Sequence, residues 1–118
     1  MTPSEHRVFI KQLEQIKVDN TLGPFTEEGI CNKYFSKYPH VYRHWYAGGN
    51  GEPQYSRESR QAAIVNKITW CEERFGNDSN RFYVANVELF HHQWFYSSSI
   101  YFCFADERDY TLFHLQWM

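Results

Sequence analysis

Residues 81–117 read RFYVANVELFHHQWFYSSSIYFCFADERDYTLFHLQW, and this stretch decides the class of fold. It holds 12 of the 23 Phe, Trp and Tyr residues of the chain. Aromatic and β-branched side chains fit a pleated, half-buried surface, so the stretch predicts a sheet. We expect strands at about 81–91, 94–105 and 110–117, with the polar residues 105–109 as the hairpin loop between the last two.

The first part of the chain carries helix signals instead. Residues 2–5, Thr-Pro-Ser-Glu, have the form of a capping box, and apolar residues then recur at helical spacing to about Asn20. Residues 26–28, Thr-Glu-Glu, predict a second helix start, and Pro39 ends or bends that helix. For residues 40–46 we expect a short helix or an irregular turn.

A longer and more apolar helix begins at Ser56 or Ser59 and ends at Gly76, a residue type that favours helix C-termini. Helices followed by strands favour an α+β fold over a parallel α/β fold. We therefore expect a single domain, residues 1–118, with a helical part at about 1–76 and a sheet at about 81–117. In it, three to four N-terminal helices pack on one face of a C-terminal three-stranded antiparallel meander.

Alternation along the expected strands assigns a core beneath the helices. The drier set consists of Tyr83, Val87, Leu89, Ile100, Phe102, Phe104, Phe113, Leu115 and Trp117. The opposite face is mixed, and its aromatic members are Phe90, Phe95, Tyr101 and Tyr110. Three alternatives stay open for that face: a covering helix or loop, an interface with a partner or second copy, or solvent.

A homodimer through the C-terminal sheet is a related expectation. The last expected strand, 110–117, carries no Lys or Pro to deter edge pairing. If it lies at the sheet edge, two copies would form a continuous sheet.

Composition limits the class of protein. The net charge of −2 does not indicate a nucleic-acid partner, although residues 33–70 hold six cations against two carboxylates. Three scattered cysteines, Cys31, Cys71 and Cys103, predict buried free thiols in a reducing compartment. No secretory signal or membrane-spanning stretch is recognisable, so we expect a cytoplasmic protein of the producing or a host cell.

The segment 37–46 is the best candidate for partner contact outside the sheet, because cations alternate there with stackable rings. With two arginines beyond the next loop, the candidate partner-binding residues are Lys37, Tyr38, His40, Tyr42, Arg43, His44, Trp45, Tyr46, Arg57 and Arg60. Three interpretations remain open: protein contact, single-stranded nucleic acid or nucleotide, and rings that belong to the core.

Catalytic chemistry has weak support in the sequence. His40 and His44 have helical metal-ligand spacing, but no acid or cysteine accompanies them at a helpful spacing. A pairing of Cys103 with His91 or His114 matches no nucleophile signature. The glycine-rich residues 48–51 lack the ending of a P-loop. We expect no catalytic residue, no metal ligand and no cofactor.

The sequence therefore predicts a small non-enzymatic protein–protein interaction module. It would resemble phage or mobile-element inhibitors and adaptors in type, acting by occupying a site on a larger partner. The first alternative is a binder of single-stranded nucleic acid or nucleotide that uses residues 37–60. The second is a small metal-dependent enzyme. No membrane partner is expected.

Overall fold

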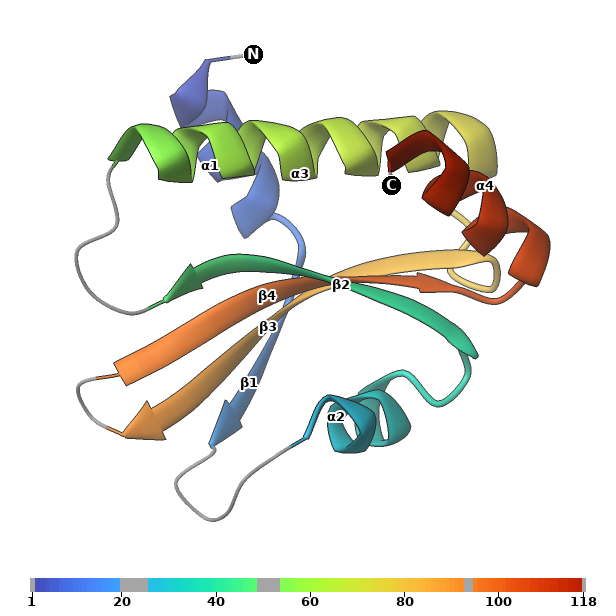
Figure 1. Ribbon diagram of the computed structural model, residues 1–118, viewed down its shortest axis with the longest axis horizontal. Coiled ribbons are helices and arrows are strands. Elements are labelled where there is room, and N and C mark those ends of the chain that lie inside the picture. Colours follow the sequence, from blue (N-terminus) through green and yellow to red (C-terminus); the bar gives the residue numbers. More distant parts are fainter. Residues whose placement is uncertain (1, 20–25, 49–53, 93–94, 118) are drawn as a thin grey trace.

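The computed structural model describes residues 2–19, 26–48, 54–92 and 95–117, and it is an α+β arrangement with one sheet between helices (Figure 1). The described residues form four helices and four strands, which alternate along the chain except that β4 follows β3 directly. The elements are α1 (Pro3–Lys11), β1 (Glu14–Asp19), α2 (Glu27–Tyr34), β2 (His40–Gly48), α3 (Gln54–Phe75), β3 (Phe82–His92), β4 (Phe95–Phe104) and α4 (Glu107–Trp117).

The strands form one mixed sheet in the order β1-β3-β4-β2. β1 runs parallel to β3, whereas the β3–β4 and β4–β2 pairs are antiparallel. The expected three-stranded antiparallel meander is therefore wrong, although the α+β class is right. Two of the four strands, β1 and β2, come from the part of the chain that was expected to be helical.

Helices cover both faces of the sheet. In Figure 1, α1, α3 and α4 lie on one side, which we call the three-helix face, and α2 lies on the other, the α2 face. Each side has its own core. The buried residues of the three-helix face include Ile10, Ile64, Ile68, Phe102, Phe104 and Phe113. Those of the α2 face include Val18, Ile30, Phe35, Ala85, Val87 and Tyr101.

The C-terminal segment expected to be the third strand is the helix α4. Its inward residues, Tyr110, Phe113, His114 and Trp117, recur at helical spacing, and Phe113 is fully buried while Leu115 is 78% exposed. Arg81 anchors the helix, because its Nε lies 2.7 Å and its Nη2 3.2 Å from the carboxylate oxygens of the buried Asp109. The edge-strand dimer has no basis, since these residues form no strand.

The expected first helix stops early. The capping box of Thr2 and Glu5 is confirmed, but α1 ends at Lys11. The following residues alternate in exposure, with Val18 buried and Lys17 exposed, and pair with β3 as a strand.

The segment 40–46, expected to be a short helix or turn, lies in strand β2. Val41, Tyr42, Trp45 and Tyr46 have high strand propensity, and pairing with β4 satisfies the backbone groups on one side of the strand. The predicted stop of the long helix is confirmed, because α3 ends at Phe75 and Gly76 adopts a positive φ of 71°.

The predicted core combined two faces of the sheet. Phe82 pairs with Phe104, so Ile100, Phe102 and Phe104 face α3. Tyr83, Ala85, Val87 and Leu89, which alternate with that set along β3, face α2 instead. Alternation gives the two sets within each strand, but only the pairing register decides which sets share a face.

Candidate functional site

β2 divides the predicted partner-binding residues between the interior and the surface. Its alternate residues His40, Tyr42 and His44 point to the three-helix face, where they meet α3 and α4. Tyr38, just before the strand, is 7% exposed in the α2-face core, and its hydroxyl donates to the Ser79 carbonyl. Its ring is therefore not available at the surface.

The interior aromatic residues of β2 pack the strand against α4. The Tyr42 ring centroid lies 5.2 Å from that of Phe113, and the His40 ring stacks 5.4 Å from Tyr110. Tyr46 instead binds α3, because its hydroxyl accepts a hydrogen bond of 3.1 Å from Gln61 Nε2. These rings contribute to packing.

His44 and Lys67 form an unusual interior pair. Lys67 Nζ lies 3.2 Å from His44 Nδ1, and the lysine also lies over the Tyr42 and Trp117 rings at 5.7 and 5.9 Å. Burial, reinforced by the charges of Lys67 and Arg60, lowers the pKa of His44 from 6.5 to about 4. The imidazole is thus neutral at pH 7 and accepts the hydrogen bond that the Lys67 ammonium donates.

Arg43, Trp45, Arg57 and Arg60 lie at the surface, and we call them the β2 edge patch. The Arg60 guanidinium stacks 4.2 Å from the Trp45 ring centroid and donates to the Tyr46 carbonyl at 2.7 Å. Trp45 remains 38% exposed. Arg43, which is exposed, donates from Nε to Ser99 Oγ at 3.1 Å, and Arg57 is exposed one turn before Arg60 on α3.

Lys37 lies apart from this patch. Its Nζ donates to Asn80 Oδ1 at 3.3 Å, in the turn that precedes β3. The ten predicted residues therefore separate into an interior set, a surface patch of four, and one distant lysine.

The four aromatic residues predicted as a sheet-face interface do not share a face. Phe90 lies on the three-helix face of β3 and is 38% exposed, whereas Tyr101 is 2% exposed in the α2-face core. Tyr110 belongs to α4. The side chain of Phe95 lies outside the described part of the structure.

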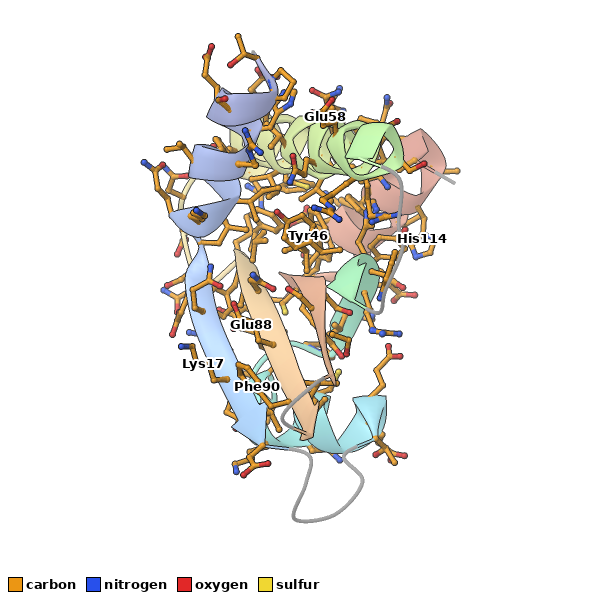
Figure 2. The ribbon with its side chains drawn as sticks, turned by 90° about the vertical axis from the view of Figure 1, so that its left-hand side faces the viewer. Lys17, Tyr46, Glu58, Glu88, Phe90 and His114 are labelled. Carbon is orange, nitrogen blue, oxygen red and sulfur yellow. The ribbon has the colours of Figure 1, made fainter. Side chains whose placement is uncertain are left out.

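A group of polar residues, of which sequence reasoning selected only Tyr46, lines a cavity of about 210 Å³ between α1 and the sheet. Its polar lining consists of Lys11, Gln15, Tyr46, Asn86, Glu88 and Ser98. Figure 2 shows Tyr46 and Glu88 on the three-helix face of the sheet. Phe90 lies further along β3, and Lys17 lies on the outer strand β1. The available signal was the alternation of β3, which places Asn86 and Glu88 in line with Phe82 and Val84.

Metal and membrane features are absent from the described ranges. Among these residues, no three His, Cys, Asp or Glu side chains lie close enough together to hold a metal ion. No helix there is both long and apolar enough to cross a membrane.

The chain matches no known family model, no curated protein and no solved structure.

Proposed function

We propose that the protein is a small non-enzymatic module that binds a larger protein partner through the β2 edge patch. The observation that carries this proposal is the half-exposed Trp45 ring stacked against the Arg60 guanidinium at 4.2 Å. Trp and Arg dominate the energetics of protein interfaces, because a large rigid ring and a planar cation bury much surface at low entropic cost. The Tyr46 carbonyl holds Arg60 in place, so the stack is preorganised.

The position of the patch on an edge strand supports this proposal. β2 pairs with β4 on one side and, within the described residues, with no strand on the other. The outer backbone groups of β2 can therefore accept an extended segment of a partner by strand addition. A register shift between Trp45 and Ala47 bends the strand, which limits such pairing to the part before the shift.

The positive charge of the β2 edge patch favours an acidic partner. The patch contributes three guanidinium groups, a type of group that binds carboxylates through charge-assisted hydrogen bonds. An acidic, extended protein segment fits both the charge and the free strand edge. A polyanionic nucleic acid is a poorer fit, because its affinity rests on many cations and the whole chain carries a net charge of −2.

The state of the thiols supports a reducing compartment such as the cytoplasm, which is part of the same proposal. Cys31, Cys71 and Cys103 are all free. Burial raises the pKa of Cys71 to about 12 and that of Cys103 further still, so neither is an activated nucleophile. An inhibitor or adaptor that acts by occupying a partner's site needs no such group.

The experiment measures binding of a library of extended acidic peptides. The comparison peptides carry Asn and Gln in place of Asp and Glu, so that they lack the side-chain carboxylates. We expect acidic peptides to bind and Trp45→Ala to weaken them by about 2 kcal/mol or more, or roughly thirtyfold. Arg60→Gln should weaken them similarly. The matched control is Arg74→Gln, because Arg74 stacks on Trp70 at 4.7 Å at the other end of the same helix.

Two results would reject the proposal. One is peptide binding that Trp45→Ala and Arg60→Gln leave unchanged while both variants remain folded. The other is binding of single-stranded DNA or RNA that is tighter than that of any peptide and falls steeply with salt. The second result would establish the nucleic-acid alternative at the same patch.

A further inference from the structure

The two central strands change character halfway along the three-helix face. The half in which β3 begins and β4 ends is apolar and consists of Phe82, Val84, Ile100, Phe102 and Phe104. The second half carries Asn86, Glu88 and Ser98, and Glu88 pairs directly with Ser98 across the strands. Asn86 and Ser98 are only 5% and 3% exposed. Burying polar groups at the centre of a sheet is unfavourable unless they form hydrogen bonds, so the partners of these groups define this half of the face.

The buried polar groups hold one another in fixed positions. Ser98 Oγ donates to Asn86 Oδ1 at 2.5 Å, and Asn86 Nδ2 donates to Gln15 Oε1 at 2.9 Å. Gln15 Nε2 in turn donates to the Leu13 carbonyl at 2.9 Å. The side chains therefore have defined orientations, which is what a binding site requires.

The polar residues of this region retain unused hydrogen-bonding capacity, and of these Tyr46, Asn86 and Ser98 line the cavity whereas Gln61 does not. The Tyr46 hydroxyl accepts from Gln61 Nε2 and retains its own proton to donate. Gln61 is 2% exposed, and its Oε1 is buried without a partner among the described residues. Asn86 has a second N–H, and Ser98 Oγ has free lone pairs.

The charges that line the cavity are of opposite sign. The side chain of Glu88 is half-buried, and its carboxylate makes no hydrogen bond or ion pair within the described part of the chain. Lys11 lines the same cavity from the last turn of α1. A half-buried, unpaired carboxylate favours a ligand ammonium group, and the lysine favours a ligand carboxylate.

We propose that this cavity binds a small zwitterion of the amino-acid type, with its ammonium group on Glu88 and its carboxylate on Lys11. Asn86, Ser98 and Tyr46 supply hydrogen bonds to the part between the charges. The volume of about 210 Å³ lies below the range of roughly 300–1,000 Å³ that holds drug-sized ligands, so the ligand is small. The site adjoins the β2 edge patch at Tyr46, whose carbonyl binds Arg60, but it does not depend on the function proposed for that patch.

The first test uses the unaltered chain and the free proteinogenic amino acids as probes. Backbone amide NMR shifts report binding, and we expect at least one amino acid to shift the resonances of Asn86, Glu88 and Ser98. Each probe is compared with its N-acetyl form, which lacks the ammonium, and with its decarboxylated amine. Both derivatives should bind about tenfold more weakly or worse, because each loses one charge-assisted contact.

The second test removes the charge of the cavity carboxylate. Glu88→Gln keeps the side-chain shape and should weaken the amino acid identified above by about tenfold to a hundredfold. Glu73→Gln is the matched control, because Glu73 is exposed in the last turns of α3 and does not line the cavity. It should leave the affinity unchanged.

The results that overturn the proposal are equally definite. They are the absence of shifts at the cavity with every amino acid, equal affinity for either derivative, and unchanged binding in Glu88→Gln. The comparison of free and modified amino acids needs no variant, so it decides the matter even if Glu88→Gln is poorly folded.

Discussion

The two halves of the three-helix face use the same strands for opposite purposes. The half beneath α4 is filled by aromatic rings. The ring centroid of Phe104 lies 5.2 Å from that of Phe113 and 5.4 Å from that of Phe82. The half beneath α1 holds a hydrogen-bonded network of Gln15, Asn86 and Ser98 around a cavity. Stability is therefore concentrated at the α4 end of the face, and the α1 end is organised to bind a small ligand.

The largest effect is expected where α4 closes the apolar half. Phe113→Ala should reduce the free energy of unfolding by about 3–5 kcal/mol, because Phe113 is fully buried and its removal leaves a cavity among Tyr42, Phe102 and Phe104. Urea denaturation followed by circular dichroism measures this loss.

Leu115→Ala is the control, and it also distinguishes helix from strand. Leu115 is 78% exposed, so the free energy of unfolding should change by less than about 0.5 kcal/mol. In a strand, residues 113 and 115 would share a face and both substitutions would be costly. Comparable losses in the two variants would therefore contradict the helix α4.

An intermediate effect is expected at His44, which pairs with Ile100 where the apolar half ends. The folded-state pKa of about 4 lies below the ordinary 6.5, so the unfolded chain binds a proton first as the pH falls. The stability that His44 contributes is complete above pH 6.5 and is lost between pH 6.5 and about 4. After allowance for solvent screening of this partly exposed group, the loss is about 1–2 kcal/mol.

The measurement is the difference in unfolding free energy between the unaltered chain and His44→Gln across this pH range. Glutamine still accepts a hydrogen bond from Lys67 but does not titrate, and the carboxylates of the chain titrate equally in both proteins. A constant difference across the range would show that His44 is not buried against Lys67.

The smallest effect on stability is expected in the polar half. Replacing Asn86 with Val and Ser98 with Ala together removes both partners of a buried hydrogen bond, which is close to neutral. We expect a change within about 1 kcal/mol in thermal or urea unfolding. Binding of amino acids at the cavity should be lost in the same variant. A destabilisation as large as that of Phe113→Ala would mean that the network serves the fold.

Local signals of the sequence correctly predicted the start of α1 and the end of α3. The Thr2–Glu5 capping box and the Gly76 stop depend on residues within one turn of each other, and both are confirmed. The strands β3 and β4 were also predicted close to their bounds, because their aromatic and β-branched content is high. These features need no knowledge of distant contacts.

Segments with two compatible periodicities were assigned wrongly. In residues 110–117, Phe113, Leu115 and Trp117 fit a strand, while Tyr110, Phe113, His114 and Trp117 fit a helix. Asp109 decides for the helix, because its carboxylate binds Arg81 at the start of β3. That contact spans 28 positions in sequence and cannot be read from local spacing.

The candidate sites also depend partly on local sequence and partly on long-range pairing. The residue types of the β2 edge patch were selected from the sequence, yet only the strand conformation of β2 placed Trp45 outward and Tyr42 inward. The cavity was not predicted, since Gln15 and Asn86 meet only through the parallel pairing of β1 with β3.

The sequence by itself determined the α+β class, the helix caps and the two central strands, because those depend on local propensity and capping. The tertiary structure alone decided the fourth helix, the two outer strands, the pairing register and the grouping of polar residues at the cavity. The physical reason is that alternating patterns specify faces within an element, whereas long-range pairing decides which faces meet.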